Sequence, residues 1–313
     1  MNESTTISEI IEAITLQISK AKNLENKKNV LLNPVNVISL GLGVQSTAMY
    51  YMSSKGELPR CDFAVFVDTG KEKKKTLQYL KFLQNWEKEN NGIPIYVVRK
   101  KNLYKDLLNG SNSTGQRFSS IPAFTKNEDD TIGMLRRQCT NEYKIEQVDR
   151  QIREVLKVRR LTGQNINVWK GISLDEIERL SVPDIGWKVH VYPFCGYSVS
   201  KTDTLKLQGG GGRLMTRNDI INWYIANGLP IPPKSSCVFC PYQSDAAWYE
   251  MKLNEPSDFR AAVRIDKAIR DSTKKGIKSQ AFLHESCVPL DQIIFSPGLP
   301  DLWHGECSGG CHT

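Results

Sequence analysis

The stretch that most constrains how this chain can fold lies at residues 35–49, where a strand pattern, a glycine turn and a helix pattern follow one another. Apolar residues at 35–40 predict a short buried strand. Gly41 and Gly43 interrupt it, and a helical pattern begins near Ser46. A helix that starts after a glycine turn points its backbone N–H groups and the positive end of its dipole at a nearby anion. The stretch therefore predicts either a phosphate site or an ordinary strand-to-helix turn, and glycine spacing alone does not separate the two.

The alternation of strands and helices continues along the chain. Strands are predicted at 62–68, 95–98 and 167–172, a helix ends near 86, and further helices are predicted at 144–160, 216–227 and 244–275. Strands and helices that alternate at this spacing form a twisted parallel sheet with helices on both faces, so we expect an α/β fold. Ligands of such sheets bind where strands end, which places Asp68 and Thr69 beside the glycine turn. Asp68 could also cap the following helix, and the two roles are compatible.

The 313 residues divide into three parts by pattern. Residues 1–34 hold an amphipathic helix, expected at 5–20, and a polar linker. Residues 35–185 form the α/β domain, and residues 186–313 form a cysteine-bearing helical appendage that we expect to pack on the glycine turn. No apolar run reaches the ~18 residues of a membrane span. The N-terminus lacks the features of a signal peptide, so we expect a cytoplasmic protein with no membrane contact.

The chain is basic, with a net charge of +8 and a pI of about 9.0. A basic balance favours polyanionic partners such as nucleic acid or a nucleotide, although lysine runs also occur on solvated helix faces. Arg136, Arg137 and Lys144 could hold phosphates or form salt bridges on a helix surface. The eight cysteines, in a cytoplasmic chain, indicate metal, iron–sulfur or redox chemistry more than disulfides.

Two groups of cysteines carry the strongest chemical signal. Cys237 and Cys240 form a C-x-x-C pair followed by proline, a spacing that lets two thiolates bind one metal centre or exchange with a disulfide. Cys139 lies among basic residues, which lower a thiol's pKa, and is a candidate third ligand. A structural zinc ion needs two further ligands, whereas iron–sulfur clusters take thiolates from distant segments. Inert buried cysteines are the alternative.

The motifs together resemble a known family. The segment at 41–47, G-L-G-V-Q-S-T, resembles the PP-loop of the adenine nucleotide alpha hydrolases, written S-G-G-x-D-S, in its phosphoadenosine phosphosulfate (PAPS) reductase-like branch. Gly41 replaces the first Ser, Leu42 the first Gly and Gln45 the Asp. The other motifs follow in family order: D-T-G at 68–70, R-Q-C-T at 137–140 with Y-K-I at 143–145, G-I-S-L-D-E at 171–176, and S-C-V-F-C-P-Y at 236–242. The match spans about residues 35–311. It is similar to PAPS reductase-like proteins of phages and mobile elements, and to the DNA phosphorothioation sulfurtransferase.

The resemblance implies a site for each ligand. It assigns a nucleotide, ATP or PAPS, to Ser39, Gly41, Leu42, Gly43, Gln45, Ser46, Asp68, Thr69, Gly171 and Ile172. It assigns a [4Fe–4S] cluster to Cys139, Cys237, Cys240 and Cys307, with Cys287 as the second choice for the fourth ligand and zinc as the alternative metal. Catalysis falls to Gln45, Ser46, Asp68 and Cys307. A magnesium ion and a homodimer are both compatible with the resemblance.

Three functions remain open at this point. In the first, the enzyme is an ATP pyrophosphatase-type sulfurtransferase that activates and thiolates a nucleic acid, DNA or tRNA, with sulfur from a cysteine desulfurase or a thioredoxin-like donor. In the second, it is a PAPS or APS reductase, in which the nucleotide donates the sulfur and Cys307 or Cys311 is the nucleophile. In the third, it is a nucleic-acid-binding regulatory protein with a degenerate loop and a structural zinc. The sequence does not name the acceptor substrate.

Overall fold

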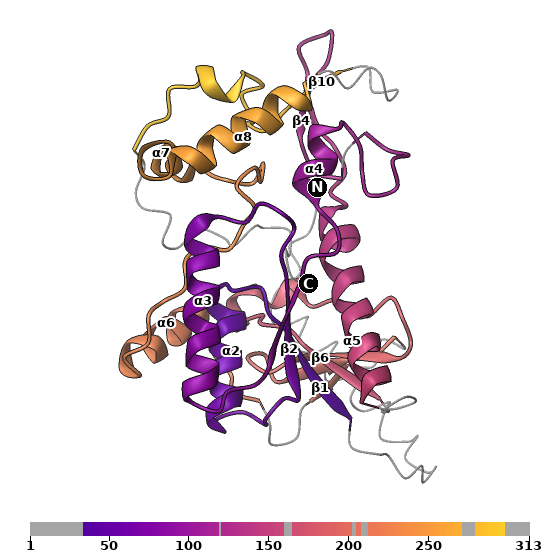
Figure 1. Cartoon of the computed structure of the whole chain (residues 1–313), viewed down its shortest axis with the longest axis vertical. Coiled ribbons are helices and arrows are strands. Elements are labelled where there is room, and N and C mark those ends of the chain that lie inside the picture. The colour runs from indigo at the N-terminus through magenta and orange to yellow at the C-terminus, as the bar shows by residue number, and fades with distance from the viewer. Residues whose placement is uncertain are drawn as a thin grey trace, which may run out of the picture.

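The computed structural model describes residues 34–118, 120–159, 165–201, 205–207, 212–270 and 279–297. Figure 1 shows these residues as two stacked parts, a sheet with its helices below and a smaller unit above. The helix expected at 5–20 lies outside the described residues, as do Cys307 and Cys311.

The lower part is built on a seven-stranded sheet with the order β3-β2-β1-β6-β7-β8-β9. The strands are β1 (Val35–Ser39), β2 (Phe63–Val67), β3 (Ile95–Val98), β6 (Ile166–Trp169), β7 (Lys188–Tyr192), β8 (Tyr197–Val199) and β9 (Leu205–Leu207). The first five in this list pair in parallel, whereas β8 and β9 add antiparallel strands at one edge. The α/β class with a mostly parallel sheet is therefore confirmed.

Helices cover both faces of this sheet. The helices α2 (Val44–Lys55), α3 (Lys74–Glu89) and α6 (Arg217–Ala226) pack on the face that presents Ile38, Ala64 and Phe66. The helix α5 (Glu146–Val158) packs on the other face, where Val37 and Val65 meet its apolar stripe. Successive side chains of a strand point to opposite faces of the sheet, so alternate residues of each strand pack in different cores. Figure 1 shows α2 and α3 on one side of β1 and α5 on the other.

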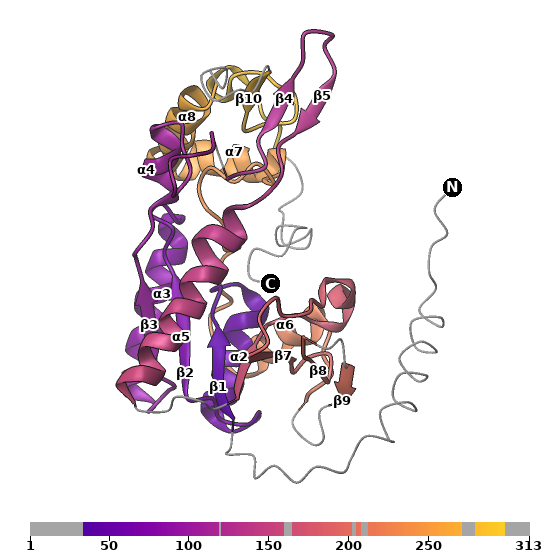
Figure 2. The ribbon, with the colours of Figure 1, turned by 90° about the vertical axis from the view of Figure 1, so that its right-hand side faces the viewer.

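The upper unit, which we call the cap, sits beyond the carboxyl end of β2 (Figure 2). It contains α4 (Leu103–Leu108), α7 (Asp245–Asn254), α8 (Pro256–Ala268), a short helix at Leu290–Gln292, and a three-stranded sheet of β4 (Phe124–Lys126), β5 (Ile132–Met134) and β10 (Gln280–Phe282). Its core is separate from that of the sheet and is centred on Phe239, Trp248 and Phe259. The expected helical appendage is present, but it also contains strands from the middle of the chain.

Three expected boundaries differ from the structure. The sheet continues through β7, β8 and β9, so it runs past the division we placed after residue 185. The helix expected at 244–275 is two helices, because Glu255 adopts φ −132° and ψ 56° and Pro256 begins the second helix. The helix expected at 144–160 is preceded by a single π turn at Asn141–Ile145.

Candidate functional site

The glycine turn holds the N-terminus of α2 at the carboxyl end of β1. Leu42 adopts a left-handed backbone, with φ 59°, at a place where the family pattern has glycine. Gly41 N donates to Ser46 Oγ at 3.1 Å, and Ser46 Oγ lies 3.4 Å from the carbonyl of Gly43. No side chain caps the helix at Gly43. The Ser46 hydroxyl thus closes the turn from within, and the helix terminus retains its affinity for an anion.

Gln45 connects this turn to a carboxylate that sequence analysis did not identify. The Gln45 side chain is fully buried, and its Nε2 donates to Glu176 Oε2 at 2.7 Å and to Ser173 Oγ at 3.2 Å. Its Oε1 has no hydrogen-bond partner among the described residues. Glu176 also pairs with Arg179 at 2.6 Å. The acidic group that the loop lacks at position 45 is therefore supplied from the segment after β6, whose motif at 171–176 was the available signal.

Gly171 fixes how that segment meets the turn. A Cβ added at Gly171 would lie 2.5 Å from Ser46 N and 2.8 Å from the carbonyl carbon of Gln45. Both of these atoms belong to the backbone, which could move aside only at a cost. Gly171 therefore packs directly on the turn, and Ile172 beside it is buried.

Asp68 and Thr69 lie at the same edge of the sheet as the turn, because β1 and β2 are parallel neighbours. This confirms the expected placement of Asp68. Its Oδ1 accepts from Gly70 N at 2.9 Å and its Oδ2 pairs with Arg99 at 2.9 Å. Thr69 Oγ1 instead contacts Cys237 Sγ at 3.2 Å, so Thr69 lies on the side of the cysteines.

Cys139, Cys237 and Cys240 line one cavity, which we call the thiol pocket. Its empty space is about 430 Å³, open solvent included. Its other lining residues are Thr69, Leu103, Ile121, Pro122, Arg137, Thr140, Lys144, Phe239, Pro241 and Tyr242. A β-bridge between Glu72 and Cys237 joins the C-x-x-C segment to the end of β2. The two cysteine groups, about a hundred residues apart in the chain, thus face a common space.

The grouping of these thiols bears on which metal they could hold. Among the described residues, no three metal-ligating side chains lie close enough together to hold one ion. In a cluster each thiolate binds a different iron, so cluster ligands stand further apart than the ligands of a single zinc ion. Among the described residues, the thiol pocket therefore presents three cysteines that face one space and no preformed site for a single ion.

The surroundings of Cys237 disfavour a role as a free nucleophile. Burial, and then the charge of Glu72, raise the pKa of the Cys237 thiol well above its usual range. Such a thiol is protonated at neutral pH and reacts slowly by itself, whereas a metal ion deprotonates it on binding.

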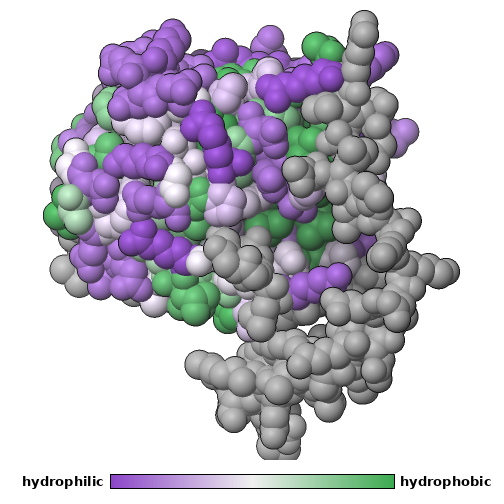
Figure 3. All heavy atoms as spheres, turned by 90° about the horizontal axis from the view of Figure 1, so that it is seen from below, coloured by the Kyte–Doolittle hydropathy of each residue, from purple (hydrophilic) through white to green (hydrophobic). Residues whose placement is uncertain are grey.

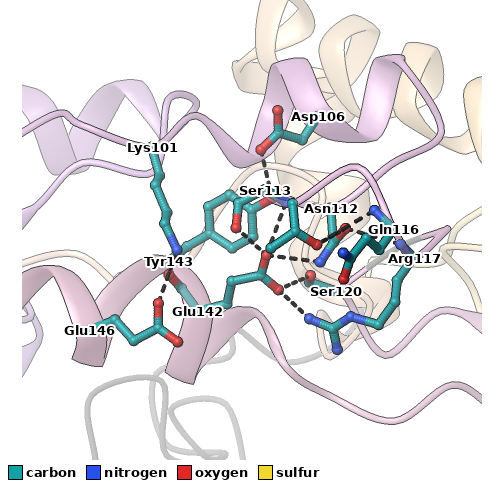
Figure 4. Close-up of polar contacts among 11 residues, drawn as sticks. Lys101, Asp106, Asn112, Ser113, Gln116, Arg117, Ser120, Glu142, Tyr143 and Glu146 are labelled. Atoms are coloured by element: carbon teal, nitrogen blue, oxygen red, sulfur yellow. Dashed lines mark hydrogen bonds and ion pairs between the residues drawn. The ribbon is translucent and has the colours of Figure 1, made fainter.

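A buried carboxylate, Glu142, anchors the loop that borders the thiol pocket (Figure 4). It accepts hydrogen bonds from Ser113 N at 2.9 Å, from Ser120 Oγ at 2.6 Å and from Asn112 Nδ2 at 3.1 Å. Arg117 pairs with it at 2.8 Å. Burial alone would raise the pKa of Glu142, but the hydrogen bonds from Ser113 and Ser120 and the charge of Arg117 outweigh it and lower the pKa.

This anchor bears directly on Cys139. Cys139 N donates to the carbonyl of Ser120 at 2.7 Å, and Glu142 N donates to the carbonyl of Gln138 at 3.0 Å. Ser120 therefore connects the two residues: its hydroxyl donates to Glu142, and its carbonyl accepts from Cys139 N. Sequence analysis missed Glu142, because a lone glutamate at the start of a helix is usually exposed.

We expect Glu142→Gln to destabilise the protein by about 2 kcal/mol at pH 7, because charged hydrogen bonds in a buried site are lost. A carboxyl with a lowered pKa stabilises the fold above its ordinary pKa, and this contribution disappears as pH falls below about 4.5. Urea unfolding at pH 7 and pH 4 should show a difference between variant and parent that shrinks in acid. The exposed Glu154→Gln is the control, and a difference independent of pH would contradict the anchor.

A second cavity lies between α5 and the sheet, with about 460 Å³ of empty space that includes open solvent. It begins at Ser39 and Leu40, where β1 enters the glycine turn. We call it the lysine pocket, and its other lining residues are Val65, Val67, Lys144, Ile145, Val148, Asp149, Val168, Lys170, Lys188 and His190. Lys144 lines both this cavity and the thiol pocket.

The remaining cysteine and histidine candidates lie elsewhere. Cys287 lies near Lys126 and Arg270 and does not line the thiol pocket, and Cys307 is outside the described residues. Cys195 Sγ donates to the carbonyl of Ile172 at 3.3 Å. His284 pairs with Asp245 at 2.7 Å, which is a structural role in the cap.

No helix within the described ranges is long and apolar enough to cross a membrane. Figure 3 shows the end of the molecule opposite the cap, where hydrophilic residues predominate and hydrophobic ones are scattered among them.

Comparison with solved structures finds similarity at low sequence identity. No family model and no curated protein matches the chain. Among solved structures, the chain is similar to the U34-tRNA thiolase NcsA from Methanococcus maripaludis, determined with its [4Fe-4S] cluster. The two share 14% sequence identity at a TM-score of 0.34, over 83% of this chain and 78% of that chain.

Proposed function

We propose that this protein is a sulfurtransferase that activates a nucleic acid with ATP and carries an iron–sulfur cluster. The observation that carries the proposal is that Lys144 lines both the lysine pocket and the thiol pocket. A phosphate group bound at the end of β1 would therefore lie one side chain away from sulfur held by the cysteines. Such adjacency is what transfer between the two sites requires.

The glycine turn would bind the nucleotide phosphates. The N-terminus of α2 offers backbone N–H groups and a positive dipole, and Gly171 keeps the turn in place. Magnesium is usually held by one or two carboxylates together with substrate phosphates, and Glu176 is the carboxylate that reaches the turn through Gln45. Asp68, held by Arg99 and Gly70, would keep the edge of the site negatively charged.

The reaction would proceed in two substitutions. An oxygen of the nucleic acid attacks the α-phosphate of ATP, its bond to the β-phosphate breaks, and pyrophosphate leaves. Sulfide then attacks the activated atom of the nucleic acid, and AMP leaves with the oxygen. Lys144 and the helix terminus stabilise the negative charge that develops on the phosphate. Cys139, Cys237, Cys240 and Cys307 would hold the cluster, and the sulfide would come from an external donor such as a cysteine desulfurase.

Two measurements test this proposal. Protein purified without oxygen should be brown and absorb in the iron–sulfur charge-transfer region, whereas a zinc protein would be colourless. Incubated with ATP, sodium sulfide and either tRNA or DNA, it should release pyrophosphate and AMP in equal amounts and thiolate one of the two nucleic acids. Lys144→Met should lower this rate by about 100-fold, the usual worth of one charged group at a developing oxyanion.

Other outcomes point to the other functions. Sulfite formed from PAPS without pyrophosphate release would identify a reductase. A colourless protein that binds nucleic acid but consumes no nucleotide would identify a regulatory protein. The exposed Lys81→Met, on the face of α3 away from both pockets, is the matched control for Lys144→Met.

A further inference from the structure

The lysine pocket has a buried and basic lining. Lys144, Lys170, Lys188 and His190 are each less than a tenth exposed. Asp149 is the one acidic residue among its lining residues. Apart from Ser39, none of these residues belongs to the nucleotide set implied by the motifs, so the family pattern does not explain why the pocket is basic.

Two of the four basic groups are already balanced. Lys188 Nζ pairs with Asp149 at 2.8 Å and with Asp184 at 3.2 Å. Burial, and then the charge of Lys170, lower the pKa of His190 to about 3, so its ring is neutral. The ring Nδ1 lies 2.8 Å from the carbonyl of Ser181. Neither Lys188 nor His190 therefore calls for an anionic ligand.

Lys170 is in a different position. It is 5% exposed, its Nζ donates to Ser181 Oγ at 3.2 Å, and within the described parts of the chain no carboxylate pairs with it. It follows directly after Trp169, which pairs with Ile38 of β1, so it stands beside Ser39 at the start of the glycine turn. The carboxylates nearest to Lys170, Asp149 and Asp184, are already paired with Lys188. A buried ammonium that shares its counter-charges in this way is costly unless a further anion binds.

We propose that the lysine pocket binds a phosphate group and that Lys170 is the residue that neutralises it. The site lies where β1 enters the turn, so the phosphate could belong to the bound nucleotide or be free pyrophosphate, and the chemistry of recognition is the same. The nucleotide as source rests on the proposed function, whereas binding of a free anion does not. The charged and titratable groups that face the site are Lys144, Lys170, Lys188, His190, Asp149, Asp184 and Tyr192.

Binding should then take up a proton. Burial, and then the charge of Lys188, lower the pKa of Lys170 to about 7 in the free protein, so about half of the molecules carry the charge at pH 7. A bound phosphate favours the charged form and raises this pKa. The protein should therefore take up about 0.5 proton per anion bound at pH 7, and affinity should fall as pH rises above 7.

The test is calorimetric titration at pH 7 in two buffers with different heats of ionisation. The probes are sulfate, which stays fully ionised near neutrality, together with ATP and adenosine. Sulfate or ATP should bind with uptake of about 0.5 proton, and adenosine should show none. Uptake with both anions indicates a site for free anions, and uptake with ATP alone indicates a site for the nucleotide's phosphate.

Two variants distinguish the effect of the positive charge at position 170 from the effect of its protonation. Lys170→Met should weaken anion binding by at least about tenfold and abolish the uptake. Lys170→Arg should bind within about threefold of the parent, also without uptake, because arginine is always charged. The exposed Lys81→Met should change neither.

Three results would overturn the inference: no proton uptake with either anion, unchanged uptake in Lys170→Met, or equal uptake with adenosine. If the protein takes up a proton on anion binding but thiolates neither tRNA nor DNA, the proposed function is wrong and the anion site is still supported.

Discussion

Alanine at position 171 is expected to weaken nucleotide binding by more than about 30-fold. Its Cβ would meet Ser46 N at 2.5 Å and Ser46 Cα at 2.7 Å, both of them backbone atoms at the first turn of α2. Because the backbone must shift to admit the methyl group, the change costs about 2 kcal/mol or more, and the displaced turn no longer presents its N–H groups to a phosphate. ATP titration against the purified variant measures the effect.

The matched control for this change is Gly186→Ala. A Cβ at Gly186 would meet the flexible end of Lys201 at 3.7 Å, an ordinary contact. Circular dichroism should show that both variants keep their helical content. A folded Gly171→Ala protein with the affinity of the parent would mean that the turn is not where the nucleotide binds.

The second large effect concerns the cysteines. Serine at position 139, 237 or 240 is expected to cut bound iron from about four atoms per chain to less than about one, because a serine hydroxyl does not replace a thiolate ligand. Each of the three lines the thiol pocket, so each substitution should have the same consequence. Iron analysis of protein purified without oxygen gives the answer.

The control here is Cys61→Ser, since Cys61 lies between α2 and β2, is buried in the core of the sheet and does not line the thiol pocket. Full iron in Cys139→Ser, with loss in the C-x-x-C variants, would show that Cys139 belongs to no shared site. Cys307→Ser tests the fourth ligand, and full iron in that variant would leave the three pocket cysteines as the complete set.

The parallel core could be predicted from sequence because its strands are short apolar runs that end in polar residues. In β2 every residue is buried, and Asp68 follows at once. The strand β7 was not predicted, because Lys188 and His190 occupy positions where a buried strand normally has valine or isoleucine. Both of these polar residues line the lysine pocket. The strand that the pattern failed to predict is therefore part of a candidate site.

The cap could not be predicted in the same way. Its strands are three residues long, and β4 pairs with β10, which lies about 150 residues further along the chain. No local period reports such a pairing. The break between α7 and α8 did have a signal, Pro256, which commonly occupies the first turn of a new helix.

The fold brings several residues named by the motifs close to one another. The glycine turn, Asp68 and the two cysteine groups were placed from their motifs. The sequence did not predict the roles of Glu142 and Lys170 or the contact between Gln45 and Glu176. Each of these depends on segments that are distant in the sequence and meet only in the folded protein.

The bridge between Glu72 and Cys237 has a thermodynamic consequence. The cap and the sheet have separate hydrophobic cores, and Cys139 and Cys237 both pack against the core of the cap. Cys237 also contacts the segment that follows β2, through Thr69 Oγ1 at 3.2 Å and the bridge to Glu72. Metal that binds only to the folded chain adds its binding free energy to the free energy of folding. If the cluster binds as proposed, iron would stabilise the cap together with its contact to the sheet, and the resistance of the protein to urea would follow its iron content.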